Sequence, residues 1–212
     1  MRIRFVFVFV AVAATFAALA SSAAPADEIG LAPARSTFPE RAYVLSLPTG
    51  KRLRASDVKV TENGHRVVDL SVVPSESSKV ASGTILAIDA SRSMRGAPIK
   101  GALEAAQAFA KQRNADHRLA ILTFNSSTRA GPFTVSQEAI DRTLTRAPRL
   151  RFGTHLYSAL AQGIQQIRAE QIDAGSIVVL SDGADVGSGV TLEQVVQAAK
   201  KANVRIFTVG LH

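Results

Sequence analysis

The feature that most constrains this chain is an unbroken apolar run that ends in a carboxylate. Residues 85–88 carry no polar side chain, and Asp89, Ser91 and Ser93 follow them directly. A run without polar alternation is typical of a parallel strand buried on both faces, and open α/β sheets bind ligands at the carboxyl ends of such strands. Pro98 then stands where a helix can begin, because the first turn of a helix tolerates proline. The stretch therefore predicts a strand, a loop with three oxygen donors, and a helix.

From residue 84 onward the sequence predicts strands alternating with helices. Apolar runs at 85–88, 119–124, 177–180 and 204–209 predict the strands. Segments with apolar residues at helical spacing lie between them, and Thr191 with Gln194 fits a capping box at the start of the third helix. Residues 128–133 are expected to add a hairpin edge strand. Repeated strand–helix units predict an α/β fold with a doubly wound, mainly parallel sheet.

Residues 1–26 have the three parts of a secretory signal peptide. Two arginines give a basic start, residues 5–20 are largely apolar, and the sequence Ala-Pro-Ala at 24–26 fits a cleavage site. The apolar stretch of about 16 residues is short for a membrane-spanning helix, which needs about 20. Cleavage after Ala20 and retention of the segment as an uncleaved membrane anchor are the alternatives.

Residues 27–80 are expected to form a small antiparallel β domain that ends in a linker. Short apolar runs at 42–47 and 67–73 flank Asn63-Gly64. Both turn residues tolerate the positive φ of a two-residue hairpin turn, so this pair is a strong hairpin signal. The serine-rich stretch at 74–82 predicts the linker. Residues 81–212 then form the α/β domain.

Composition narrows the kinds of site that the chain can hold. There is no cysteine, which excludes disulfides and thiolate metal sites. The formal net charge is +8, but the basic residues are scattered among acids, and Lys51-Arg52-Leu53-Arg54 is their only cluster. Such a short cluster is typical of a solvated turn, so we expect no nucleic-acid partner.

Two later motifs supply further oxygen donors. Thr154 stands where the second long helix begins, and Asp182 follows the third predicted strand. The ends of neighbouring strands and their loops converge in a doubly wound sheet, so both residues are expected near the first loop. The set would then hold two carboxylates and three hydroxyls. The alternative is that these residues only cap helices and turns.

With these motifs in place, the sequence resembles the von Willebrand factor type A family with its metal-ion-dependent adhesion site. The pattern D-x-S-x-S matches Asp89, Ser91 and Ser93, and the later threonine and aspartate match Thr154 and Asp182. The resemblance runs from about residue 82 to the end and implies a Rossmann-like fold. The family normally continues with a helix, an edge strand and a final helix, so the domain is expected to be incomplete at its C-terminus.

The resemblance also implies a function. In the family the hydroxyls coordinate the ion directly while the aspartates often act through water, which leaves the metal open to a carboxylate of the ligand. We therefore expect a binding or adhesion module, not an enzyme, that holds Mg²⁺, with Mn²⁺ and Ca²⁺ as alternatives, and recognises a Glu or Asp of a protein partner. The order of segments resembles bacterial envelope proteins of the tight-adherence type. The module is then secreted, or tethered to the membrane through residues absent here or an uncleaved anchor.

Two further considerations bear on this function. Four arginines flank the predicted site and would give it a positive rim, although ordinary solvated arginines explain them as well; they are Arg92, Arg95, Arg149 and Arg151. The alternative function is a Mg²⁺-dependent phosphatase-like hydrolase, which also places an aspartate at the end of a first strand. Its mechanism commonly needs a second acid two residues later, where this chain has Ser91.

Overall fold

The structure is a computed structural model that describes residues 5–9, 30–34, 36, 41–46, 53–74 and 80–211. The chain divides into two compact units, Met1–Val80 and Ala81–His212. In the described part of the chain, no helix combines the length and apolarity needed to cross a membrane.

The first unit is a small β structure, as the sequence predicts. Its main strands are β1 (Phe5–Phe9), β2 (Gly30–Ala34), β3 (Arg41–Ser46) and β6 (Leu70–Pro74), in the order β2-β3-β1-β6. Strand β2 is antiparallel to β3, whereas β1 runs parallel to both β3 and β6. Strand β1 falls within the predicted signal peptide, whose removal stays a prediction.

The predicted hairpin at Asn63-Gly64 is confirmed. Strands β4 (Thr61–Glu62) and β5 (His65–Arg66) pair antiparallel around it, and a short 3₁₀ helix, η1 (Ala55–Asp57), precedes them. The turn residues have φ of 50° and 82°, as a primed two-residue turn requires. Of the predicted linker, residues 75–79 lie outside the described residues.

The second unit has the predicted alternation of strands and helices. Its strands are β7 (Ser82–Asp89), β8 (Arg118–Phe124), β9 (Thr128–Ala130), β10 (Ala174–Ser181) and β11 (Val204–Gly210). Its helices are α1 (Ala97–Gln112), α2 (Gln137–Leu144), α3 (Leu156–Ala169) and α4 (Leu192–Ala202). The sheet order is β11-β10-β7-β8-β9, and all strands are parallel except β9. The doubly wound, mainly parallel sheet is therefore confirmed.

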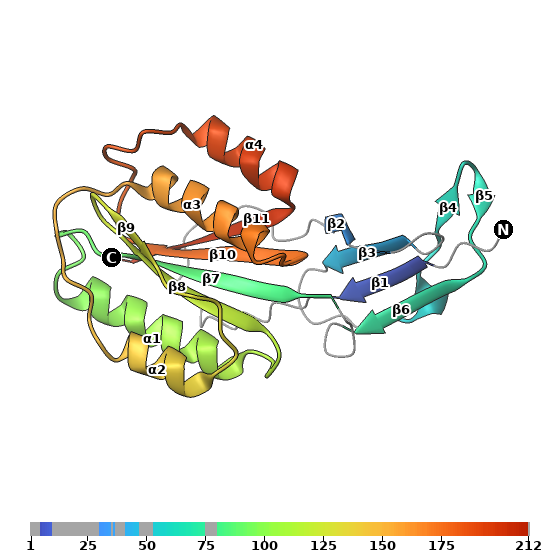
Figure 1. The fold of residues 1–212 in the computed structure, drawn as a ribbon, viewed down its shortest axis with the longest axis horizontal. Helices are drawn as coiled ribbons and strands as arrows, with labels where there is room; N and C mark the ends of the chain where they lie inside the picture. Colours follow the sequence, from blue (N-terminus) through green and yellow to red (C-terminus); the bar gives the residue numbers. More distant parts are fainter. Residues whose placement is uncertain are drawn as a thin grey trace. The chain divides into compact units, whose positions relative to one another are not determined.

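Helices cover both faces of this sheet, with α1 and α2 on one face and α3 and α4 on the other (Figure 1). Strand β7 serves both layers, because Ile85 and Ala87 join one buried cluster while Leu86 and Ile88 join the other. This two-sided burial explains why the run lacks polar alternation.

Local sequence sets the helix ends that matter for the site. Pro98 lies in the first turn of α1, as expected. Thr191 and Gln194 form the predicted capping box of α4, with the Thr191 hydroxyl 3.3 Å from the Gln194 amide nitrogen. Helix α2 was not predicted, and the edge strand expected at 128–133 ends at Ala130. Phe133 instead packs into the core.

The strand order creates a switch point at β7. The chain leaves β7 for β8 on one side and later returns to β10 on the other side. Neighbouring loops diverge at such a point, and a crevice opens at the carboxyl ends of the strands. The predicted site residues at the ends of β7 and β10 therefore lie at this crevice.

Helix α3 is capped from a distant loop. His155 precedes the helix without a side-chain capping bond. Asp185, in the loop after β10, accepts a 2.9 Å hydrogen bond from the Tyr157 amide, and the Ser188 hydroxyl accepts one of 3.0 Å from the Ser158 amide. Desolvation raises the pKa of the Asp185 carboxyl, but hydrogen bonds from Ser188 and Tyr157 outweigh it, so this pKa lies below its ordinary value.

Helix α3 packs closely on β10 at Gly175, so a substitution at this position tests the packing. A Cβ at this position would lie 2.5 Å from Cγ2 of Ile167 in α3. We expect Gly175→Ala to lower the free energy of unfolding by about 1–3 kcal/mol, because overpacking forces neighbours to shift. Gly189→Ala, where no atom lies within 4 Å, is the control and should change it by less than about 0.5 kcal/mol. Equal urea midpoints for the two variants would contradict this packing.

The cap of α3 gives a second test. Asp185→Ala should lower the free energy of unfolding at neutral pH by about 0.5–2 kcal/mol, because first-turn amides lose their acceptor. The folded-state pKa of Asp185 lies below its ordinary value of 3.8. The stabilisation of the folded state by this carboxylate is therefore fully present above the ordinary pKa and is lost as pH falls through the folded-state pKa. Urea unfolding from pH 7 to pH 3 should show the difference in free energy of unfolding between wild type and Asp185→Ala becoming smaller. Glu104→Ala is an exposed control. A difference that stays constant with pH would refute the capping role of the Asp185 carboxylate.

Candidate functional site

Asp89 is the most deeply buried residue of the predicted site. It ends β7 and its side chain is 0 % exposed. One carboxylate oxygen, Oδ1, accepts a 2.7 Å hydrogen bond from the Ser91 amide, and Oδ2 accepts one of 2.5 Å from the Ser181 hydroxyl. Within the described residues no positively charged side chain pairs with it. Such a buried charge is costly unless something compensates it.

Beyond the Ser91 amide, two serine hydroxyls lead from the loop after Asp89 to the surface. The Oγ atoms of Ser91 and Ser93 lie 2.9 Å apart, and Ser93 donates a 3.0 Å hydrogen bond to Oδ1 of Asp182. Ser91 is buried, Ser93 is exposed and Asp182 is half-buried. Met94, fully buried in the core beneath α1, anchors the loop. The structure thus links four of the five residues that the sequence predicts for the site.

Thr154 reaches the same edge of the sheet through its backbone. Its amide and carbonyl pair with Val186, four residues after Asp182, at 3.3 and 2.9 Å. Nearby, the Arg151 amide donates a 2.9 Å hydrogen bond to the Ala90 carbonyl, which ties this segment to the first loop. The side chain of Thr154 is 9 % exposed. No hydrogen bond in the described part of the chain joins its hydroxyl to the other four predicted residues.

Ser181 is a site residue that the sequence prediction missed. It is buried at the end of β10, it holds Oδ2 of Asp89, and its oxygen accepts a 3.2 Å hydrogen bond from the Gly183 amide. The parallel register pairs Leu180 with Ile88, which sets the next residue of each strand side by side. The sequence signal that could have identified Ser181 is a hydroxyl residue directly before Asp182 at the end of a predicted strand.

Asn125 is a second missed residue, and it braces the loop that carries Thr154. It is buried after β8, and its side chain accepts a 3.0 Å hydrogen bond from the Ser127 amide. Its carbonyl accepts a 2.8 Å bond from the His155 amide. Asn125 thereby fixes the position of the residue next to Thr154. His155, which directly precedes α3, lines a cleft beside the site.

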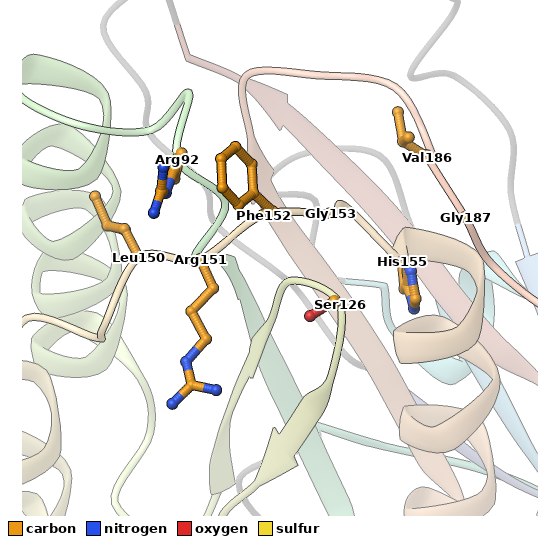
Figure 2. Close-up of a pocket in the computed structure, with 9 residues that line it drawn as sticks. All are labelled: Arg92, Ser126, Leu150, Arg151, Phe152, Gly153, His155, Val186 and Gly187. Carbon is orange, nitrogen blue, oxygen red and sulfur yellow. The ribbon is translucent and has the colours of Figure 1, made fainter.

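A cleft of about 610 Å³ opens beside these residues (Figure 2). Its walls come from the loop after β7, the turn between β8 and β9, the segment before α3 and the loop after β10. Phe152 is 69 % exposed, and the Arg92 guanidinium lies 3.7 Å from the centre of its ring. Of the four arginines expected around the site, Arg92 and Arg151 line the cleft, and Arg95 and Arg149 are exposed.

Metal binding here would depend on hydroxyl oxygens. Within the described residues no group of three or more His, Cys, Asp or Glu side chains is placed to hold a metal ion. The only acids of the predicted set are Asp89 and Asp182, so the serine and threonine hydroxyls would have to complete any coordination shell. Oxygen donors of this kind suit hard cations such as Mg²⁺.

The comparisons with solved structures show the fold. The chain is similar to a von Willebrand factor type A structure from Catenulispora acidiphila, with 19% identity, a TM-score of 0.53, and coverage of 62% of this chain and 33% of that one. It is also similar to an aerotolerance-related membrane protein from Bacteroides fragilis NCTC 9343, with 17% identity, a TM-score of 0.52, and coverage of 61% and 67%.

A third similar structure is the three N-terminal domains of the type V pili tip protein Mfa5 from Porphyromonas gingivalis. Its identity is 21%, its TM-score is 0.47, and the match covers 54% of this chain and 22% of that one. The chain thus spans about a fifth of that structure and a third of the Catenulispora structure. No curated protein sequence matches this chain significantly.

A protein-family match covers most of β7 and all the later strands of the second unit. The von Willebrand factor type A domain matches residues 85–212, which is more than half of the chain. The match includes all five positions of the predicted site and confirms the resemblance drawn from the D-x-S-x-S motif. This chain belongs to the von Willebrand factor type A domain family.

Proposed function

We propose that this chain is a binding module that recognises an acidic group of a protein partner through a Mg²⁺-type ion. Domains of this family are generally binding or adhesion modules. The ion would be held by the five predicted residues, Asp89, Ser91, Ser93, Thr154 and Asp182. The observation that carries the proposal is the wholly buried carboxylate of Asp89, which accepts a hydrogen bond from the amide of the loop that carries Ser91 and Ser93 and has no cationic partner among the described side chains.

The spacing of the oxygens fits a small, hard cation. Octahedral Mg²⁺ has bonds of about 2.0–2.1 Å, which places neighbouring ligand oxygens about 2.9 Å apart. The Ser91 and Ser93 oxygens are separated by 2.9 Å, and Ser93 and Asp182 by 3.0 Å. Mn²⁺ and Ca²⁺ also accept oxygen ligands, and Ca²⁺ would need longer bonds. The donor set therefore suits a hard cation, for which we propose Mg²⁺.

The charge balance supports an acidic ligand. Both oxygens of Asp89 already accept hydrogen bonds, which supports a role through water rather than direct coordination. Two aspartates against a divalent cation leave little negative surplus to repel a further carboxylate. Ser93 is exposed and Asp182 half-buried, so a partner's Glu or Asp can approach from this side.

A binding role also fits better than a hydrolase role. The phosphatase-like alternative needs an acid two residues after the strand-end aspartate, and the Ser91 hydroxyl that stands there is hydrogen-bonded to Ser93. The signal peptide predicted in residues 1–26 supports an extracytoplasmic location, secreted or tethered in the cell envelope. The similar Bacteroides structure is described as a membrane protein.

The metal site is tested by removing its buried carboxylate. We expect wild type to bind Mg²⁺ in calorimetry and Asp89→Ala to show no measurable binding, because the base of the site is gone. Thermal unfolding in a chelator should show that the variant is folded, and added Mg²⁺ should raise the unfolding temperature of wild type but not of Asp89→Ala. Asp116→Ala, an exposed turn residue, is the control. Unchanged Mg²⁺ affinity of Asp89→Ala would refute the site.

Partner binding is tested separately with Asp182, which lies nearer the surface. A pull-down from envelope extract should recover a protein with wild type in Mg²⁺ and lose it in chelator. Asp182→Ala should fail to recover it under either condition. Recovery that is equal in Mg²⁺ and in chelator would rule out metal-dependent recognition.

The role of Ser181 gives a sharper test, because this residue donates a hydrogen bond to Asp89 and is not one of the five proposed ligands. Ser181→Ala should weaken Mg²⁺ affinity about 10-fold to 100-fold, as loss of a group that orients a metal ligand typically does. Ser176→Ala is a matched control, since it removes another buried hydroxyl of β10, one that is hydrogen-bonded to Thr84 at 2.7 Å. Equal Mg²⁺ affinities for the two variants would show that Ser181 does not position Asp89.

A further inference from the structure

The cleft beside the metal-site residues has a chemistry that the metal site alone does not explain. Residues that line the cleft are sequence neighbours of the site residues. Arg92 stands between Ser91 and Ser93, and Phe152 stands two residues before Thr154. A partner held at the site would therefore extend across this cleft. Figure 2 shows Arg92 and Phe152 side by side at one end, with Val186 and His155 at the other.

The cleft exposes apolar surface at two places. Phe152 is 69 % exposed and Val186 is 63 % exposed, although both stand on backbone that is tied down. The Phe152 carbonyl accepts a 3.1 Å hydrogen bond from the Ser126 amide, and Val186 pairs with Thr154. Large apolar side chains that are held toward solvent on rigid backbone are typical of contact surfaces.

The acidic and basic side chains that line the cleft are all basic. Arg92 and Arg151 line it, and no carboxylate does so among the described residues. Neither arginine forms an ion pair within the described part of the chain. Arg92 instead lies over the ring of Phe152, a contact that leaves the edge of its guanidinium open to an acceptor. The cleft thus combines two unpaired cations with apolar surface.

The shape of the cleft is built into the backbone. Gly153 has φ of 85°, and a Cβ there would lie 3.0–3.1 Å from atoms of Ser126. Arg151 is bridged to Ser91, and its amide bonds to the Ala90 carbonyl at 2.9 Å. The apolar and charged groups are therefore fixed relative to the metal-site loop before any partner arrives, which lowers the entropy lost on binding.

We infer that the cleft receives an acidic peptide segment of the partner protein that carries more than the metal-bound carboxylate. A second carboxylate of that segment pairs with Arg151, and an apolar side chain packs against Phe152. The inference rests on the proposed function, because the first carboxylate is placed by the metal. It goes further by giving the partner a composition, namely two acids and one apolar residue in one short segment.

The test uses synthetic peptides of known composition. Acetylated glycine–serine peptides that carry one glutamate are compared, in Mg²⁺ and in chelator, with the same peptides bearing a second glutamate or a phenylalanine at each position in turn. For wild type, the best position of each added residue should tighten binding about tenfold, the scale of a charge-assisted hydrogen bond. The one-glutamate peptide should bind in Mg²⁺ only.

Substitutions in the cleft should separate the two gains. Arg151→Gln should abolish the gain from the second glutamate, and Phe152→Ser should abolish the gain from phenylalanine. Both variants should keep Mg²⁺-dependent binding of the one-glutamate peptide. Arg129→Gln, an exposed arginine on β9, and Val135→Ser, whose side chain is 51 % exposed before α2, are matched controls that should keep both gains.

The outcomes distinguish this inference from the proposed function. Mg²⁺-dependent binding of the one-glutamate peptide, without any gain from added residues, would overturn the cleft and leave the metal-dependent function standing. Gains that persist unchanged in chelator would support the cleft as an acidic-peptide site and contradict the role of the metal. If no peptide binds under either condition, both proposals fail.

Discussion

The placement of one buried carboxylate organises the functional end of this domain. Asp89 ends the central strand β7 between the two helical layers, where its charge has no access to water. Its oxygens are held by the Ser91 amide and the Ser181 hydroxyl, one from its own loop and one from the neighbouring strand. A buried carboxylate costs free energy unless hydrogen bonds or a cation compensate it; the hydrogen bonds are present, and a cation at this position stays a prediction. The family relationship and the oxygen set both agree with this interpretation.

The loops around this carboxylate act as a connected unit. The Ala90 amide donates to the Phe124 carbonyl, and the Ala90 carbonyl accepts from the Arg151 amide, so one residue ties the loop after β7 to the end of β8 and to the segment before α3. Thr154 is joined in turn to the loop after β10 through Val186. A separate backbone bond, from the Ser126 amide to the Phe152 carbonyl, fixes Phe152 two residues before Thr154. The residues of the predicted site and the cleft are therefore positioned by one loop arrangement.

The sequence predicted the sheet and the hairpin well, because their signals are local. Residues 85–88 are buried on both faces, and Asn63-Gly64 has the positive φ values that its turn requires. Helix α2 escaped prediction because only Ile140 and Leu144 of its short span are buried. The roles of Ser181 and Phe152 depend on strand register and loop contacts between segments far apart in sequence, which no local pattern reveals. That Asp89, Ser91, Ser93, Thr154 and Asp182 bind one ion stays a prediction.

The most direct measurement of the central claim is the location of the ion itself, by nuclear magnetic resonance with Mn²⁺ as a paramagnetic substitute. If the five residues hold one ion, substoichiometric Mn²⁺ should first broaden the amide signals of the loops that carry Ser91, Ser93, Thr154 and Asp182, and excess Mg²⁺ should restore them. Broadening that is confined to other acidic positions, or that Mg²⁺ fails to reverse, would contradict the account.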